Sequence, residues 1–168
     1  MDAKPILVRV ARALREQGLE AVLIGNAAAA IQGAPVTTMD LDFLIRKTPA
    51  NIAKLKRLAT SLDAVIFTPF YPVSGLFRLS RDADSLQVDF MTTIHGIRSL
   101  NSLRSGAIAV DLDGERIWVA ALADIIASKR AADRPRDRAV LDVLEATLKQ
   151  KEKEAQPGRH SGGPQEGD

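Results

Sequence analysis

The chain has no cysteine and few aromatic residues. Without cysteine it has no disulfides, no thiolate zinc ligands and no cysteine nucleophile, and such a composition fits a reducing compartment. Aromatic residues make up 4% of the chain, with a single Trp and a single Tyr. An extended surface on which nucleic-acid bases stack is therefore not expected.

Long apolar runs are also missing. No stretch reaches the length of a membrane-spanning helix. The first residues, MDAKPILVRVARALREQG, mix charged with apolar residues and lack the uninterrupted apolar core of a signal peptide. We therefore expect a cytoplasmic protein with no membrane partner.

Strong net charge is absent too, since the formal charge is +2. This is no signature of nucleic-acid binding by itself. The basic residues are uneven, however, and the stretch SKRAADRPRDR at 128–138 is rich in them. This stretch is either a local basic surface or a solvated junction between helices, and the sequence leaves both interpretations open.

What the chain does have is apolar content for one packed domain: 168 residues, 46% of them hydrophobic. From Gln156 onward the composition changes to Gly, Pro, His and charged residues. We expect a single domain over residues 1–152 and a disordered tail over 153–168.

Hydrophobic periodicity predicts an α+β fold, a mixed β-sheet flanked by helices with further helices at the C-terminus. The predicted helices span 4–17, 27–32 with Asn26 as the cap, 49–62 with Thr48 as the cap, 121–133 and 134–155. The predicted strands are 19–25, 39–46 and 65–68, a hairpin of 76–80 with 86–91, and a hairpin over 107–120 that turns at Asp113-Gly114.

Two carboxylates interrupt an apolar strand pattern in MDLDFLI. Residues i and i+2 of a strand point to the same face, so Asp40 and Asp42 project together while Met39, Leu41 and Phe43 face the other way. Adjacent carboxylates repel each other unless a cation or water screens them. Either this face is simply wet, or the pair belongs to a site.

A third carboxylate, Asp89 in LQVDFM, lies in a later apolar strand. If the two strands are neighbours, Asp89 joins Asp40 and Asp42, and the only cationic side chain within these two strands is Arg46. Three carboxylates suit Mg²⁺, which prefers oxygen ligands and shares them with substrate phosphates. Two such ions can serve phosphoryl or nucleotidyl transfer. Taken alone, Asp89 is equally well read as a surface residue at a strand edge.

Gly25-Asn26 stands where a strand turns into a helix. Backbone N–H groups at a helix N-terminus favour bound phosphate, and glycine permits close approach. An ordinary turn capped by asparagine is the alternative.

In combination these motifs resemble the nucleotidyltransferase superfamily of the DNA polymerase beta type. The resemblance covers roughly residues 20–145 and rests on Gly25-Asn26, the spacer, MDLDFL and the downstream QVDF. Within the superfamily the chain looks most like the bacterial AbiEii-type group, which includes toxins of toxin–antitoxin pairs. IGNAAAAIQGAPVTTMDLDFLI and LADIIASKRAADRPRDRAVLDVL carry that likeness.

The resemblance implies a metal-dependent enzyme that transfers NMP from an NTP to an acceptor hydroxyl of RNA, tRNA, a protein or a small molecule. A cognate antitoxin is an implied partner. The implied roles are Mg²⁺ ligation and catalysis by Asp40, Asp42 and Asp89, and nucleotide binding by Gly25, Asn26, Thr38, Lys129 and Asp137.

Two positions depart from the family pattern. Asn26 replaces the usual second glycine or serine, and Val36 stands where many relatives carry arginine. A catalytically impaired protein of the same fold, which binds nucleotide or a partner protein, is therefore the alternative. A plain interaction protein with an incidental acidic face is a third interpretation. The sequence does not specify the NTP, the acceptor, a toxin or housekeeping role, or the oligomeric state.

Overall fold

The computed structural model describes residues 4–38, 40–68 and 75–156. Within these ranges, seven strands form one mixed sheet in the order β3-β4-β5-β2-β1-β7-β6. The strands are β1 Val22–Ile24, β2 Leu41–Leu44, β3 Val65–Phe67, β4 Leu76–Arg81, β5 Leu86–Met91, β6 Ile108–Leu112 and β7 Glu115–Val119. Helices flank this sheet, so the predicted α+β class is confirmed.

Strand pairing combines hairpins with parallel neighbours. β4 and β5 form one antiparallel hairpin and β6 and β7 another, as the sequence predicts. The central strands β1 and β2 are antiparallel to each other. β2 lies parallel to β5, and β1 lies parallel to β7.

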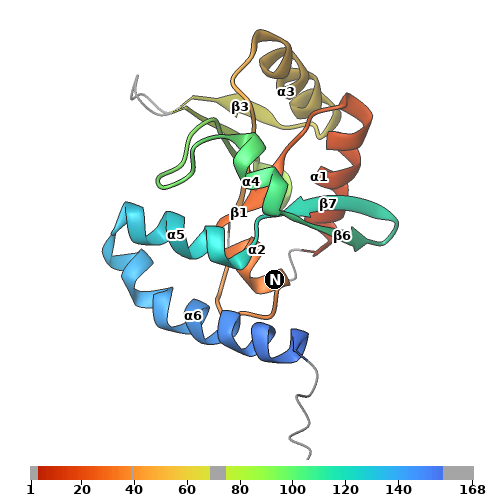
Figure 1. The fold of residues 1–168 in the computed structure, drawn as a ribbon. Helices are drawn as coiled ribbons and strands as arrows, with labels where there is room; N and C mark the ends of the chain where they lie inside the picture. The colour runs from red at the N-terminus through yellow and green to blue at the C-terminus, as the bar shows by residue number, and fades with distance from the viewer. Residues whose placement is uncertain (1–3, 39, 69–74, 157–168) are drawn as a thin grey trace, which may run out of the picture.

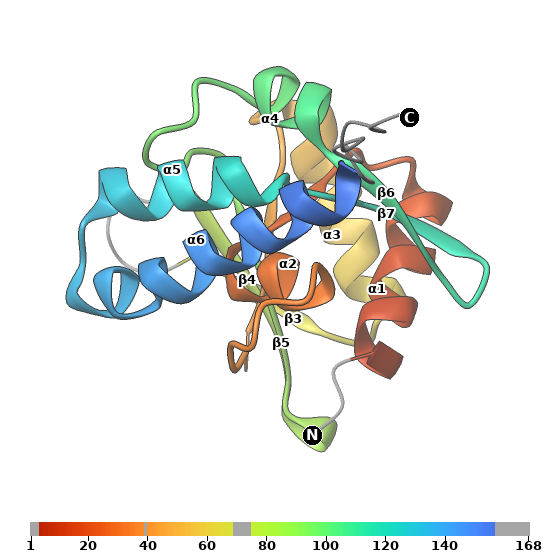
Figure 2. The same cartoon turned by 60° about the horizontal axis from the view of Figure 1, so that its bottom comes forward.

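Two groups of helices, α1 with α3 and α5 with α6, lie on different sides of the view in Figure 1. α1 packs on α3 and β7, whereas α2 packs on α5, and α5 lies side by side with α6 (Figure 2). The helices are α1 Lys4–Gln17, α2 Gly25–Ile31, α3 Pro49–Ser61, α4 Leu100–Gly106, α5 Leu122–Ala132 and α6 Pro135–Ala155, with a 3₁₀ turn at Asp82–Asp84.

Most predicted helices are confirmed, and the cap of α3 is an example. The Thr48 side chain accepts a hydrogen bond from the backbone N–H of Asn51, and Pro49 opens the helix. α4 is an addition that hydrophobic periodicity did not indicate. It is a short helix whose N-cap, Ser99, accepts from the N–H of Ser102.

The predicted cap of α2 is wrong. The helix begins at Gly25, directly after β1, and Ile24 is its N-cap without a side-chain hydrogen bond. Gly25 has a φ of +68°, a left-handed value that glycine adopts readily, so the turn is completed before Asn26. Asn26 therefore lies within the first turn and does not precede it.

The predicted strand 39–46 is shorter in the structure. β2 spans Leu41–Leu44, and Asp40 immediately precedes it. The backbone N–H of Ile45 still donates to the carbonyl of Met91, which extends the contact with β5. Met39 lies outside the described residues.

The neighbouring strands β2 and β5 are joined by an aromatic pair. Phe43 of β2 and Phe90 of β5 are register partners, and their rings stack with centroids 5.4 Å apart. Both side chains are buried in the core, on the opposite sheet face from Asp42 and Asp89. This pair therefore fixes how the two carboxylate-bearing strands lie against each other.

The C-terminal boundary stays a prediction. α6 continues to Ala155, and residues 157–168 of the predicted tail lie outside the described part of the chain. In the described residues no helix has the length and apolarity to cross a bilayer.

We expect Phe90→Ala to lower the free energy of unfolding by about 3–5 kcal/mol, because it leaves a cavity beneath the central strands. Urea denaturation followed by circular dichroism measures the change. Val65→Ala is the matched control, since Val65 is 69% exposed on the edge strand β3. Equal effects of the two substitutions would contradict the assigned core.

Candidate active site

One row of residues crosses four strands and carries the predicted chemistry. Ile24 of β1 is the register partner of Asp42, and Asp42 is the partner of Asp89. Asp89 is in turn the partner of Arg78 on β4. Cross-strand partners on one face lie within contact distance, so the sheet places two carboxylates and a guanidinium side by side.

Gly25 closes one end of this row. A Cβ atom built at this glycine would lie 3.2 Å from Oδ2 of Asp42, closer than ordinary packing allows. Glycine thus satisfies both the left-handed backbone and the tight space beside the carboxylate. The Gly25-Asn26 motif therefore lies directly beside Asp42 of the aspartate pair.

Thr38, Asp40 and Asn26 line the approach to the row. The Thr38 hydroxyl donates to the backbone carbonyl of Asp40 at 2.8 Å, and Gln87 Nε2 donates to Asp40 Oδ1 at 3.3 Å. Asn26 Nδ2 donates to the Thr37 carbonyl at 3.5 Å. Asn26 Oδ1 is buried, and among the described residues no donor reaches it.

A cavity of about 540 Å³ opens over this face of the sheet. Its volume lies within the usual range for small-molecule and cofactor sites. All eight residues that the sequence singled out line it: Gly25, Asn26, Thr38, Asp40, Asp42, Asp89, Lys129 and Asp137. The structure therefore brings the predicted set together from the start of α2, the segment that leads into β2, the strands β2 and β5, and the helices α5 and α6.

The helices α5 and α6 supply the basic wall of the cavity. Lys129 Nζ lies 3.6 Å from Asp137 Oδ1, and Arg134 Nε donates to Asp137 Oδ2 at 2.6 Å. Burial alone would raise the pKa of Asp137, but the Arg134 hydrogen bond and charge outweigh it and lower that pKa. Asp137 thus stays ionised and pairs with Lys129 of α5 and with Arg134 at the start of α6.

The cavity residues that the sequence interpretation did not assign to the site include the cations Arg78 and Arg136. Arg78 lies on β4, whereas our search of the sequence for cations covered only the strands that contain Asp42 and Asp89. Its Nε and Nη2 donate to the two oxygens of Asp89 at 2.8 and 3.0 Å. The hairpin register was the signal that could have found it, because Arg78 and Asp89 are equidistant from the turn.

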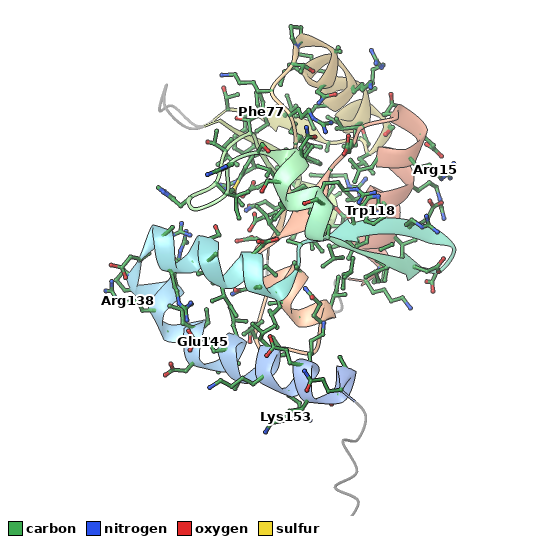
Figure 3. The ribbon with its side chains drawn as sticks, viewed as in Figure 1. Arg15, Phe77, Trp118, Arg138, Glu145 and Lys153 are labelled. Atoms are coloured by element: carbon green, nitrogen blue, oxygen red, sulfur yellow. The ribbon has the colours of Figure 1, made fainter. Side chains whose placement is uncertain are left out.

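Arg136 lies on the exposed first turn of α6, between two arginines that are engaged elsewhere. Arg134 pairs with Asp137 and Arg138 with Asp133, whereas Arg136 has no ion pair within the described part of the chain. Figure 3 shows Arg138 and Glu145 along α6, at the opposite side of the view from Arg15 on α1. Arg136 thus offers the cavity a cation that forms no ion pair with a carboxylate in the described ranges.

Asp42 is the electrostatic centre of the site. Burial, followed by the charges of Asp89 and Asp40, raises its pKa to about 6, and Lys129 and Arg136 oppose the rise only in part. Burial lowers the pKa of Lys129, although Asp137 counteracts it. An ionised Asp42 is therefore incompletely compensated by the protein, which is the condition that a bound cation relieves.

The donor set fits a divalent cation in one specific way. Among the residues that the structure describes, no three carboxylates or histidines converge on one metal-sized point. Asp89 is held by Arg78, which leaves Asp40 and Asp42 as the available pair. Mg²⁺ is commonly held by one or two carboxylates together with substrate phosphates and water, and this pair meets that requirement.

Solved structures with this fold include nucleotidyltransferases. The antibiotic-resistance factor ANT(2'')-Ia in solution aligns with a TM-score of 0.62 at 12% identity, over 92% of this chain and 90% of that chain. Its crystal structure with adenylyl-2''-tobramycin gives 0.61 at 14% identity, over 92% and 94%. An antigenic nucleotidyltransferase-like protein from Paracoccidioides brasiliensis gives 0.59 at 14% identity, over 88% and 75%.

These likenesses define the fold class as that of the nucleotidyltransferases, and at such low identity they define the fold alone. A comparison with curated protein sequences gives no match. A family model, described as nucleotidyl transferase of unknown function (DUF2204), matches residues 3–156. The chain therefore belongs to this nucleotidyltransferase family.

The raised pKa of Asp42 predicts a stability that depends on pH. The folded-state pKa of about 6 lies above the ordinary 3.8, so the free energy of unfolding is unaffected below about pH 4, falls as the pH rises from 4 to 6, and stays at its lower value above pH 6. In metal-free buffer, we expect Asp42→Asn to raise the free energy of unfolding at pH 8 by on the order of 2–3 kcal/mol.

Urea denaturation between pH 4 and pH 8 in the presence of EDTA measures this gain, which should shrink as the pH falls. Asp142→Asn is the control, because it removes the same charge from an exposed position on α6 outside the cavity. A gain of the same size at pH 4 and pH 8 would refute the electrostatic origin.

Proposed function

We propose that the chain is a metal-dependent nucleotidyltransferase that transfers NMP from an NTP to an acceptor hydroxyl. The observation that carries the proposal is the partly buried carboxylate row, Asp42 beside Asp89 with Asp40 adjacent, at the floor of a cavity with a basic wall. A nucleoside triphosphate with Mg²⁺ would match both the acidic floor and the basic wall of the cavity. The metal would bind the carboxylates, and the phosphates would bind the cations.

The proposed chemistry is in-line transfer at the α-phosphorus. The acceptor oxygen forms a bond to Pα, the bond from Pα to the oxygen that bridges to Pβ breaks, and pyrophosphate leaves. Asp40 and Asp42 are proposed to hold the metal, and Asp89 is proposed to complete the metal site and to take the hydroxyl proton. Bound Mg²⁺, as two ions in this proposal, would neutralise the charge that develops on the transferring group.

The remaining cavity residues position the nucleotide in this proposal. Lys129 and Arg136 line the same cavity, and their charges oppose the rise in the pKa of Asp42, so both are proposed to contact phosphates bound over the carboxylate row. Asp137 orients Lys129 through the 3.6 Å ion pair. Gly25, Asn26 and Thr38 border the same space and would contact phosphate oxygens or the nucleoside, which we infer from the family resemblance.

For the acceptor we propose RNA, with a tRNA end as the first case to test. The exposed arginines of the first turn of α6 support it, because phosphate contacts of this kind give affinity without base reading. A small-molecule hydroxyl is the second case, and the complex of ANT(2'')-Ia with adenylyl-2''-tobramycin provides its precedent in this fold. A protein hydroxyl is the third.

The biological assignment follows the sequence resemblance. We propose an AbiEii-like cytoplasmic protein, and within that group the toxin of a toxin–antitoxin pair with a cognate antitoxin as partner. The single domain over 1–152 belongs to the same proposal.

Two observations favour a second candidate, a protein that binds nucleotide without transferring it. Asn26 brings an unpartnered Oδ1 to the place where the family has a glycine or serine, and Asp89 is bound at both oxygens by Arg78. Either feature can disable transfer and leave nucleotide binding intact.

A transfer assay separates the candidates. With Mg²⁺, each of four α-³²P-labelled NTPs, and bulk RNA or tRNA, we expect label transfer that Asp40→Ala and Asp42→Ala reduce by at least about 100-fold. Asp142→Ala should retain full activity. Transfer that survives both cavity substitutions would refute the proposed site, and nucleotide binding without transfer to any acceptor would favour the second candidate.

Asn26 gives a sharper test. A buried acceptor without a partner costs roughly 1–3 kcal/mol, so Asn26→Ser should stabilise the fold by about 1 kcal/mol and, by opening the phosphate approach, increase the transfer rate. Asn51→Ser is the control, because Asn51 lies outside the cavity and its Nδ2 donates to the Arg46 carbonyl at 2.9 Å. Loss of nucleotide binding in Asn26→Ser would show instead that the amide holds the nucleotide directly.

A further inference from the structure

Arg78 competes for the same carboxylate that the proposed metal site requires. Its guanidinium engages both oxygens of Asp89, at 2.8 and 3.0 Å, in the two-point geometry that makes arginine–carboxylate pairs strong. The Asp89 side chain is 6% exposed and that of Arg78 33% exposed. The pair is thus anchored in the sheet at the aspartate end and open to the cavity at the arginine end.

The surroundings of Arg78 reinforce the competition. The hydrogen bond with Asp89 raises the pKa of Arg78, and the charges of Asp40 and Asp42 raise it further. The guanidinium therefore lies in the field of all three carboxylates, as a bound divalent cation would. Among the described residues this explains why no three carboxylates converge on one point, since Asp89 is turned to Arg78.

Asp89 is also the sole hydrogen-bond partner of the Arg78 side chain in the described ranges. The neighbouring Arg81, by contrast, pairs with Asp84 and also donates to the backbone carbonyl of Leu62. Arg78 can thus release one Asp89 oxygen by rotating toward the cavity, where an NTP would offer phosphate oxygens in its place.

We propose that Arg78 is a positioning residue that holds Asp89 away from the metal in the nucleotide-free site and releases it when nucleotide and metal enter. The inference rests on the proposed metal-dependent function and adds an order of events. Asp40 and Asp42 accept the first cation, and Asp89 joins only after Arg78 exchanges its carboxylate partner for phosphate. Metal affinity without nucleotide is therefore held low by the protein itself.

Binding of Mn²⁺ to the full chain at pH 8 without nucleotide tests this directly, with free Mn²⁺ measured by electron paramagnetic resonance. We expect Arg78→Gln to bind Mn²⁺ about tenfold more tightly or better than the wild type, because one opposing charge in contact with a carboxylate shifts its affinity for a cation by about that factor. Arg78→Lys keeps the charge but not the two-point pair, and should lie near the wild type.

Arg81→Gln is the matched control, since it breaks a two-point arginine–aspartate pair on the same strand outside the cavity. Its Mn²⁺ affinity should equal that of the wild type. Thermal unfolding with and without Mn²⁺ gives a second readout, in which the metal should raise the Tm of Arg78→Gln more than that of the wild type. A merely structural Arg78 would lower the Tm of the variant and leave its Mn²⁺ affinity unchanged.

Asp42→Asn in the wild-type background distinguishes the two levels of failure. Mn²⁺ that binds the wild type, is lost in Asp42→Asn and binds Arg78→Gln equally or more weakly would overturn the role of Arg78 and leave the metal site standing. Absence of Mn²⁺ binding in the wild type and in Arg78→Gln alike would overturn the metal site and the role of Arg78 together.

Discussion

The parallel pairing of β2 with β5 is the constraint on which the site depends. It makes Asp42 and Asp89 register partners on one face while Phe43 and Phe90 stack on the other. The aromatic face supplies the burial that holds the strands together, and the carboxylates on the opposite face must then accept a low-dielectric position beside each other. A sheet that gave up this pairing would lose its central contact.

Cations elsewhere in the cavity compensate part of the negative charge of these carboxylates. Arg78 neutralises Asp89 from β4, Asp137 gathers Lys129 and Arg134 at the junction of α5 and α6, and Asp42 is left with a pKa of about 6. The protein thus balances its anionic floor only in part. The metal-bound triphosphate that we propose as the ligand would complete this arrangement, and membership of a nucleotidyltransferase family agrees with that proposal.

Local patterns carried much of the structure. The two hairpins, the caps of α3 and the helix at 135–155 followed from turn residues and apolar spacing, because each depends on contacts close in sequence. The cap of α2 was misread, since the helix starts at the left-handed Gly25, two residues earlier than a cap at Asn26 would allow. α4 lacked a signal because it is short and has only two buried residues.

The sequence by itself determined the chemistry available to this protein: carboxylates at i and i+2, a third in a later strand, and a glycine at a strand end. It determined these because side-chain alternation and backbone sterics act between near neighbours. The register of the β4–β5 hairpin places Arg78 on Asp89, a local signal that the sequence interpretation did not use. Only the tertiary structure decided the other meeting of charges, because the return of α6 along α5 brings Asp137 to Lys129. That contact joins separate helices, whose partners are selected by packing of the whole core and not by a local pattern.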